Sequence, residues 1–271
     1  MCAKSSLTIV DSNQSSIAIH FHISHDVSGS VVKANAIVGS NQRCIVIHGS
    51  HYALIDSNIA YNTKGHCFMT EDGNEFGNVF ENNLGALTLP VETENLLSSV
   101  DSDDNPSTYW MPTPRNTLTG NVAAGSKGAG FWFEVEGFFR GASQNAPEAL
   151  DGSLPIPSRQ NLAPYIFDSN KAHSNSGNGM QTYPSGGWKP PIEAIFSNFV
   201  SYRNRGAGAF SHNGLNQTYN GGYFADNQHI GIDIDRSYHG RIEDATIVGY
   251  SAEYEALVEY PSNTWGIQAL S

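Results

Sequence analysis

Ionisable side chains recur at two fixed positions along this sequence. The first position holds His20, Arg43 and His66, which are 23 residues apart. The second lies five residues further on and holds His25, His48 and Glu71, continuing to Glu134, His212 and Asp235. Imidazoles and carboxylates held close together shift one another's pKa and can act as general acids and bases.

This residue set suggests defined chemical roles. Glu71 and Glu134, with Asp72 beside the first, are the candidate acid and base carboxylates, and His48 and His66 are candidate proton carriers or orienting groups. Arg43 could bind a substrate carboxylate through two hydrogen bonds. The same His, Asp and Glu residues could instead hold a metal ion, or form polar ladders that simply face water.

A second group of residues suits sugar recognition. Aromatic rings stack on the C–H faces of sugars, while nearby polar groups bind the hydroxyls. The candidates for substrate binding, besides Arg43, are His20, His25, Trp110 and Trp132.

The spacing of these residues indicates the elements that position them. Cys44 and Cys67 are 23 residues apart, as are Gly208 and Gly231. A fixed period of this size indicates stacked units, and none of these units is long enough for two helices. The short β-rich runs, broken by Asn and Gly, predict one all-β domain over residues 1–271, a parallel β-helix (solenoid) of about nine coils.

Equivalent positions in successive coils form columns about 4.8 Å apart per coil. One column is apolar and is predicted to face the core: Ile45, Phe68, Phe131, Met180, Ala209 and Ile232. His22 aligns with this column, so it is expected to be buried or at the end of the core. Asn35, Asn58, Asn121 and Asn170 fit a turn at which each side chain bonds to the next coil.

The two central cysteines, Cys44 and Cys67, are predicted to be neighbours in one column. At that spacing their Cα atoms lie inside the disulfide range. The side-chain torsion decides whether a bridge forms, so the sequence leaves that question open.

Two segments interrupt the coil pattern. Residues 88–114 are rich in Pro, Asp and Glu, and residues 138–163 contain three prolines. Proline fits poorly in central strands. Both segments are therefore expected to leave the rod as loops and to wall a groove beside Glu71 and Glu134.

Composition limits the partners. The formal net charge of −12 argues against nucleic acid, whose phosphates require a basic face. No run approaches the roughly 20 apolar residues of a membrane span, and no signal peptide is visible. The chain opens almost directly in strand-like sequence, so we expect a piece of a longer protein, and the oligomeric state is unconstrained.

Several motifs resemble a known family. They are the runs Arg43–Gly49, Gly65–Gly73, Ser107–Met111 and Gly130–Phe133. These runs look like the parallel β-helix region of the cell-migration-inducing, hyaluronan-degrading proteins, which the transmembrane cell-surface hyaluronidase and the fibrocystin-like proteins share. The resemblance covers roughly residues 17–230. It implies a right-handed β-helix, action on hyaluronan or a related glycan, calcium as a cofactor and a secreted or cell-surface location.

The sequence thus favours recognition and hydrolysis of an anionic polysaccharide. Two coils between Glu71 and Glu134 would correspond to about 9.6 Å, the upper edge of the spacing in inverting glycosidases. A uronate lyase that uses Arg43 and His48 is an alternative. A non-catalytic glycan-binding or structural rod is another.

Overall fold

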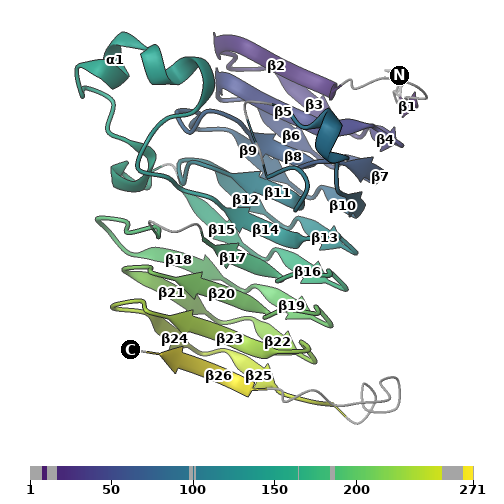
Figure 1. The fold of residues 1–271 in the computed structure, drawn as a ribbon, viewed down its shortest axis with the longest axis vertical. Helices are drawn as coiled ribbons and strands as arrows, with labels where there is room; N and C mark the ends of the chain where they lie inside the picture. Colours follow the sequence, from purple (N-terminus) through teal and green to yellow (C-terminus); the bar gives the residue numbers. More distant parts are fainter. Residues whose placement is uncertain are drawn as a thin grey trace.

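The computed structural model describes residues 8–10, 17–97, 100, 102–163, 165–183, 187–251 and 265–270. The chain winds into a rod in which three parallel sheets run along the long axis (Figure 1). Two of the sheets have nine strands and the third has eight. The prediction of an all-β parallel β-helix of about nine coils is confirmed.

The three sheets are designated A, B and C, and each coil contributes one strand to each of them, except that sheet C has no strand in the last coil among the described residues. Sheet A comprises β1 (Thr8–Val10), β4 (Ala36–Val38), β7 (Ile59–Lys64), β10 (Leu84–Leu89), β13 (Val122–Ala124), β16 (Lys171–His173), β19 (Val200–Tyr202), β22 (Tyr223–Ala225) and β25 (Thr246–Val248). Sheet B comprises β2 (Ile17–Asp26), β5 (Gln42–His51), β8 (Phe68–Thr70), β11 (Ser107–Met111), β14 (Ala129–Phe133), β17 (Met180–Thr182), β20 (Ala209–His212), β23 (Ile230–Asp235) and β26 (Trp265–Leu270). Sheet C comprises β3 (Val31–Lys33), β6 (Leu54–Asp56), β9 (Val79–Glu81), β12 (Thr117–Thr119), β15 (Ile166–Asp168), β18 (Ala194–Ser197), β21 (Gln217–Asn220) and β24 (Arg241–Glu243).

The predicted inward column forms the core of the rod. Ile45 pairs with Phe68, and the same register continues through Tyr109, Phe131 and Met180. All of these side chains are fully buried. Stacked rings add directional contacts, since the Phe68, Tyr109 and Phe131 rings lie nearly parallel at 4.9 and 4.6 Å.

The predicted asparagine ladder is also present. Asn58 donates from its side-chain nitrogen to Asn83 Oδ1 at 3.0 Å, and Asn83 donates in the same way to Asn121 at 3.0 Å. Asn121 continues the ladder to Asn170 at 3.1 Å. Each of these amides also bonds backbone groups, so the turn at every coil is tied to its neighbours.

Cys44 and Cys67 are neighbours, as the 23-residue period predicts, with their Cα atoms 4.5 Å apart. The question of a bridge is answered here because the two sulfurs form a disulfide. The bond links β5 to the start of the next coil, at the level of the ionisable residues.

Part of the predicted first loop belongs to the rod. Residues 107–111 form β11, which pairs with β8 and β14 inside sheet B. The expectation that all of 88–114 leaves the rod was wrong, because the prolines and acidic residues lie on either side of a buried strand. Of the described residues, 90–97, 100 and 102–106 leave the rod, and they are called the first insertion below. It carries the 3-10 helix η1 (Thr93–Asn95).

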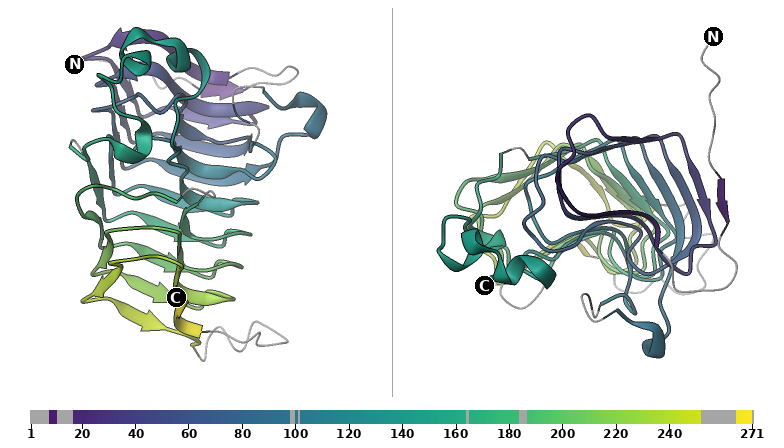
Figure 2. Two further views of the ribbon diagram at one scale, coloured as in Figure 1. Left: turned by 60° about the vertical axis from the view of Figure 1, so that its left-hand side comes forward. Right: turned by 90° about the horizontal axis from the view of Figure 1, so that it is seen from above.

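The second insertion, residues 138–163, leaves the rod as predicted. It carries η2 (Gly141–Asn145), α1 (Pro147–Leu150) and η3 (Pro157–Arg159). Figure 2 shows the η1 and α1 segments projecting beyond the outline of the coils when the rod is seen from above. Among the described residues, no helix is long and apolar enough to span a bilayer.

The first coil departs from the 23-residue period. His22 pairs with His48, a separation of 26 residues, and the register shifts between Ile17 and Ile19 and again between His22 and His25. Ile23 and His25 both have positive φ, which bends the strand. The predicted alignments of His20 with Arg43 and of His25 with His48 were therefore wrong.

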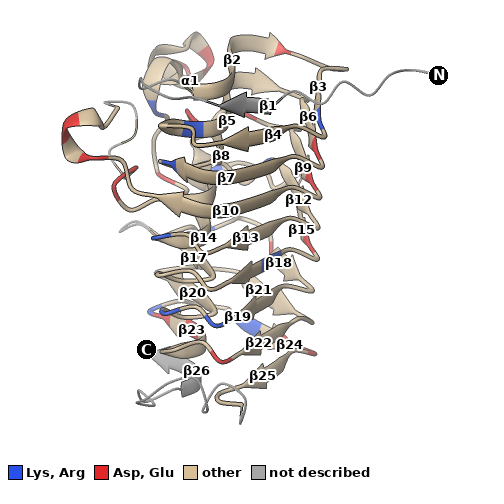
Figure 3. Cartoon of the chain, turned by 90° about the vertical axis from the view of Figure 1, so that its right-hand side faces the viewer, with Lys and Arg blue, Asp and Glu red and all other residues tan. Residues whose placement is uncertain are grey.

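Charged side chains gather along one corner of the rod. Asp56 and Glu81 are in register at the ends of β6 and β9, and Asp168 occupies the corresponding end of β15. Figure 3 shows this acidic edge running along the rod. It lies where sheet C turns into sheet A, on the opposite side of each coil from sheet B.

Candidate functional site

The outer face of sheet B carries the candidate site. Every second residue of a strand points away from the core, and on this face the outward residues include Val46, Met69, Trp110 and Trp132. Val100 of the first insertion packs against them. The face is therefore partly roofed, which lowers the local dielectric and strengthens interactions between charges there.

One outward column holds most of the ionisable groups. His22 pairs with His48, and Glu71 follows in the next coil because Ile47 pairs with Thr70. Glu134 lies two coils beyond Glu71, since Met69, Trp110 and Trp132 are in register. His22 thus points outward and not into the core as expected. The extra residues of the first coil shift it onto this face.

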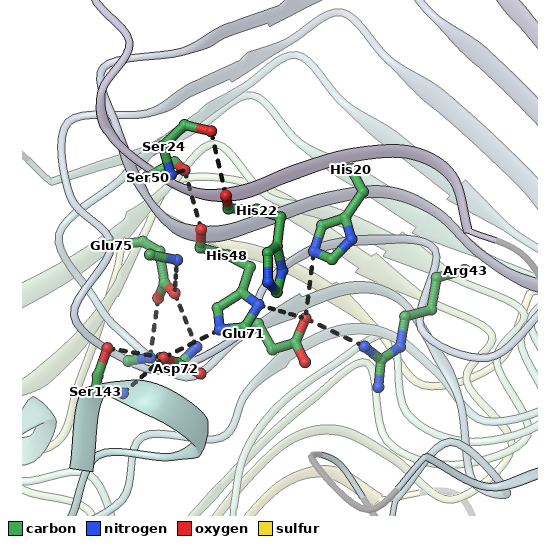
Figure 4. Close-up of polar contacts among 12 residues, drawn as sticks. His20, His22, Ser24, Arg43, His48, Ser50, Glu71, Asp72, Glu75 and Ser143 are labelled. Carbon is green, nitrogen blue, oxygen red and sulfur yellow. Dashed lines mark hydrogen bonds and ion pairs between the residues drawn. The ribbon is translucent and has the colours of Figure 1, made fainter. Parts of the chain in front are cut away.

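Glu71 is the hub of the cluster (Figure 4). Its Oε2 lies 3.3 Å from Arg43 Nη1, 3.7 Å from His48 Nδ1 and 3.9 Å from His20 Nε2. The side chain of Glu71 is only 6% exposed, whereas that of His20 is 27% exposed. A buried carboxylate therefore faces three cationic or potentially cationic groups at the edge of solvent.

Asp72 links this cluster to the second insertion. Its Oδ2 lies 3.2 Å from His48 Nε2 and accepts hydrogen bonds from Ser143 N at 3.0 Å and Ser143 Oγ at 2.7 Å. Burial opposes protonation of His48, but contact with Asp72 and the charges of Glu71 and Glu75 outweigh it and raise the pKa of His48. Asp72 therefore both orients the imidazole and fixes the loop beside it.

Glu75 lies beneath the same turn. It accepts hydrogen bonds from the backbone N–H groups of Gly49, Asp72 and Gly73 at 2.8 to 2.9 Å. Burial, together with the charge of Asp72, raises the pKa of Glu75 to about 7. This carboxyl shapes the backbone that presents Asp72.

Arg43 is fully buried and ties the first insertion to the rod. Its Nε and Nη2 donate to Asp103 Oδ2 at 3.2 and 3.0 Å, while Asp103 Oδ1 accepts from His66 N at 2.7 Å. The Arg43 side chain is 0% exposed. The Arg43 guanidinium therefore cannot contact a substrate carboxylate. Its role is to position Glu71 and the first insertion.

His66 is also a buried structural group. Its Nδ1 accepts a hydrogen bond from Ser107 N at 3.0 Å, and its Nε2 contacts Ser102 Oγ at 3.1 Å. Burial lowers the pKa of His66 to about 4, so the ring stays neutral at physiological pH. It stacks on Trp110 and is poorly placed as the proton carrier predicted for it.

Glu134 forms the second polar centre of the face. Trp110 Nε1 donates to its Oε2 at 2.6 Å, and Ser102 Oγ donates to the same oxygen at 3.3 Å. Arg140 Nη2 from the second insertion lies 3.3 Å from Oε1. Burial raises the pKa of Glu134 even though Arg140 opposes the shift.

The remaining aromatic and histidine candidates lie either buried beneath the face or away from Glu71. Trp110 is completely buried and supports Glu134, and Trp132 is 5% exposed with its Nε1 donating to the carbonyl of Tyr183. Neither ring is open for stacking on a sugar. His25 faces a separate surface pocket with His51 and Phe76, away from Glu71. Of the residues predicted to bind substrate, His20 is therefore the one with an accessible side chain beside Glu71.

The outward column continues down the rod as predicted. His212 Nδ1 lies 2.5 Å from Asp235 Oδ2, and the two residues are direct register partners. Asp233 is on the same face, and burial together with Asp235 raises its pKa to about 6. Polar chemistry thus extends along sheet B beyond the two insertions.

Sequence reasoning missed several members of the site. Asp103 and Arg140 lie in the insertions, which were predicted as loops without roles for single charged residues, and Ser143 is an ordinary loop serine. Glu75 follows the Glu71–Asp72 pair closely enough to suggest a role. His22 also carried a signal, since it stands two residues from His20 in an alternating strand.

The expected calcium ion fits these residues poorly. Calcium takes six to eight oxygen ligands. Here Asp72 is engaged by Ser143 and His48, Glu134 by Trp110 and Arg140, and Glu71 by Arg43. Among the described residues, the grouping with metal-ligand spacing consists of three histidine nitrogens.

The fold and the face together define a class of protein, a parallel β-helix with a loop-flanked polar site on one sheet. A family model described as "CEMIP beta-helix" matches residues 13–180. The chain belongs to this family.

Curated relatives agree with this assignment. The chain is 28% identical over 251 residues to the human "Cell migration-inducing and hyaluronan-binding protein", covering 72% of this chain and 18% of the relative. It is 32% identical over 189 residues to the human "Cell surface hyaluronidase CEMIP2", covering 60% and 13%. It is 38% identical over 118 residues to mouse "Fibrocystin-L", covering 43% and 3%. The chain therefore spans less than a fifth of the length of these relatives.

Proposed function

We propose that the outer face of sheet B binds an anionic, hyaluronan-like polysaccharide and hydrolyses its glycosidic bonds. Two of the relatives carry hyaluronan in their names, as a bound ligand or as the target of a hyaluronidase. The observation that carries the proposal is the pairing of two carboxyl groups in different environments on one face. Glu134 is desolvated and has a raised pKa, whereas Glu71 is paired with Arg43.

The different environments suggest different tasks. A carboxyl with a raised pKa keeps its proton and suits the general acid, while a carboxylate held by positive groups suits the general base. Since β11 completes the intervening coil, Glu71 and Glu134 are two strand spacings apart, about 9.6 Å. That separation leaves room for a water molecule and supports inversion over retention.

The proposed step transfers two protons. Glu71 accepts a proton from a water molecule as the water oxygen attacks the anomeric carbon. Glu134 gives its proton to the glycosidic oxygen as the bond to the anomeric carbon breaks. His48, oriented by Asp72, lies 3.7 Å from Glu71 and would take part in binding or proton relay. His20 would meet the glycan at the solvent edge.

The lyase alternative loses its main support. Elimination from a uronate needs a cation that neutralises the substrate carboxylate. Arg43 was the candidate, but it is fully buried and already paired with Asp103 and Glu71.

One observation favours a second candidate, binding without cleavage. The side chains of Glu71 and Glu134 are only 6% and 9% exposed, so a sugar must displace loop contacts to reach either carboxyl. The names of the relatives include binding as well as hydrolysis.

The test uses hyaluronan oligosaccharides with the wild-type chain and with Glu71→Gln and Glu134→Gln. Calorimetry measures binding, and release of reducing ends measures hydrolysis. Each variant should lower turnover by about 10²-fold or more while binding persists. Glu243→Gln, an exposed carboxyl on β24, is the matched control and should change neither quantity.

The outcomes separate the candidates. Binding with no product from the wild-type chain would support the non-catalytic alternative. Hydrolysis that survives both substitutions would refute the assignment of Glu71 and Glu134. Absence of both binding and product would refute a glycan function for this part of the chain.

A further inference from the structure

Three imidazoles meet at one point on the outer face of sheet B. His20 and His22 come from β2 and His48 comes from β5, and one ligand atom of each lies within 4.8 Å of the others. The ring of His22 stands edge-on to those of His20 and His48, with centroids 4.9 and 4.7 Å apart. Figure 4 shows the three rings converging above Glu71.

Three imidazole nitrogens this close together can share one bound ion. Burial, and to a smaller extent the neighbouring imidazoles, lower the pKa of His20 although the charge of Glu71 opposes the shift. Neutral imidazoles expose a nitrogen lone pair, and imidazole nitrogen suits zinc, copper, nickel and iron. His20 and His22 are exposed, so small side-chain rotations can close the nitrogens around an ion at bond lengths of about 2.0–2.1 Å.

His48 provides an independent indication. Its side chain is 10% exposed, yet neither ring nitrogen makes a well-formed hydrogen bond within the protein. Nε2 faces Asp72 Oδ2 at 3.2 Å, which places the ring proton on that side. Nδ1 then presents its lone pair toward the cluster. A carboxylate behind a histidine is the usual arrangement for a metal ligand, since it fixes the tautomer and raises basicity.

The surrounding charges also favour a cation. Asp72 and Glu71 contact His48, and Glu75 lies behind Asp72. The one opposing cation in contact with this group among the described residues is Arg43, and its charge is already shared between Glu71 and Asp103. Glu71 Oε2 remains within 3.9 Å of two of the imidazoles and can offset the ion's charge.

We propose that His20, His22 and His48 bind one divalent transition-metal ion of the zinc class, with the fourth position open to solvent. Three histidines with an open position form a known tetrahedral ligand set for zinc. Calcium is not expected, because these donors are nitrogens. The proposal does not depend on the proposed function, since it concerns an ion and no glycan.

The test measures Zn²⁺ binding to the metal-stripped chain by competition with a chelating dye, and records the visible spectrum with Co²⁺. The wild-type chain should bind one equivalent of Zn²⁺ and give the intense bands of tetrahedral Co²⁺. His22→Ala removes a solvent-exposed ligand and should weaken Zn²⁺ binding by more than about 100-fold, given that outer partners alone are worth 10–100-fold. Asp72→Asn should weaken binding by about 10–100-fold.

His25→Ala is the matched control. It lies on the same strand and is equally exposed, but it faces a different pocket. Zn²⁺ affinity should be unchanged in this variant, and far-UV circular dichroism should match the wild type in both histidine variants. Failure of the wild-type chain to take up Zn²⁺ would overturn the proposal. So would an equal loss of affinity in His25→Ala and His22→Ala, or an octahedral Co²⁺ spectrum.

Discussion

Removing the Arg43 side chain should destabilise the rod strongly. Arg43→Ala would leave Asp103 and Glu71 buried without their cation, and Asp103 is 0% exposed. Breaking a buried ion pair from one side costs about 3–5 kcal/mol. In a domain of this size about 1 kcal/mol shifts the melting temperature by about 2–4 °C, so the expected loss is about 10 °C.

Thermal unfolding followed by circular dichroism measures this loss, and a surface pair gives the control. Lys64 Nζ lies 2.5 Å from Glu92 Oε1, but the two side chains are 29% and 49% exposed. Lys64→Ala should therefore cost no more than about 1 kcal/mol. The double variant Arg43→Met with Asp103→Leu should recover part of the stability, because it removes the unpaired charge of Asp103 while Glu71 still lacks Arg43.

Equal melting temperatures for Arg43→Ala and Lys64→Ala would refute the reasoning. That result would mean that the first insertion opens readily and that Asp103 reaches water when its partner is lost. A double variant no more stable than Arg43→Ala would show that packing beneath the insertion, and not charge, sets the cost.

Other substitutions test the remaining features. Because burial raises the pKa of Glu75 to about 7, above its value of 4.5 when exposed, the stability that it contributes is full below about pH 4.5 and falls by about 3 kcal/mol as the pH rises through 7. Glu75→Gln should abolish this part of the pH dependence, measured as the difference between the melting curves of wild type and variant, and parallel curves would contradict it. Replacing Cys44 and Cys67 by Ser should cost about 3 kcal/mol in chemical denaturation, and an unchanged midpoint would argue against a stabilising bridge. Asn83→Ala should cost about 2 kcal/mol or more, since it leaves two buried backbone groups of the preceding coil, Asn58 N and Ile55 O, without their partner, and a smaller loss than at exposed Asn198 would be inconsistent with the ladder.

The sequence predicts the repeating part of the rod well because each coil is specified by residues within that coil. Every coil requires an apolar residue that faces the core and an amide side chain at the turn. Residues of these types, such as Ile45 and Phe68 in the core and the asparagines of the ladder, therefore recur about once per coil. The prediction fails in the first coil, where positive φ at Ile23 and His25 absorbs extra residues. Residue spacing alone does not reveal where a bulge will form.

The site depends on contacts that the period does not encode. Arg43 meets Asp103 across 60 residues, and Asp72 meets Ser143 across 71. An acidic residue in a proline-rich loop has the same composition whether it faces water or closes over a buried arginine. The burial of Arg43, His66 and Trp110 could therefore not be anticipated. The sequence did place Arg43 and His66 correctly in one column.

The disulfide has a mechanical consequence. A solenoid under tension unravels from its ends, since each coil is held only by its neighbours. A force applied ahead of the first coil would strip β2 and then begin to pull on β5. The Cys44–Cys67 bond would arrest this unravelling, because the loop that it closes cannot be drawn out further. Glu71, Asp72 and Glu75 lie just beyond that clamp, so they should keep their geometry under loads that remove His20 and His22.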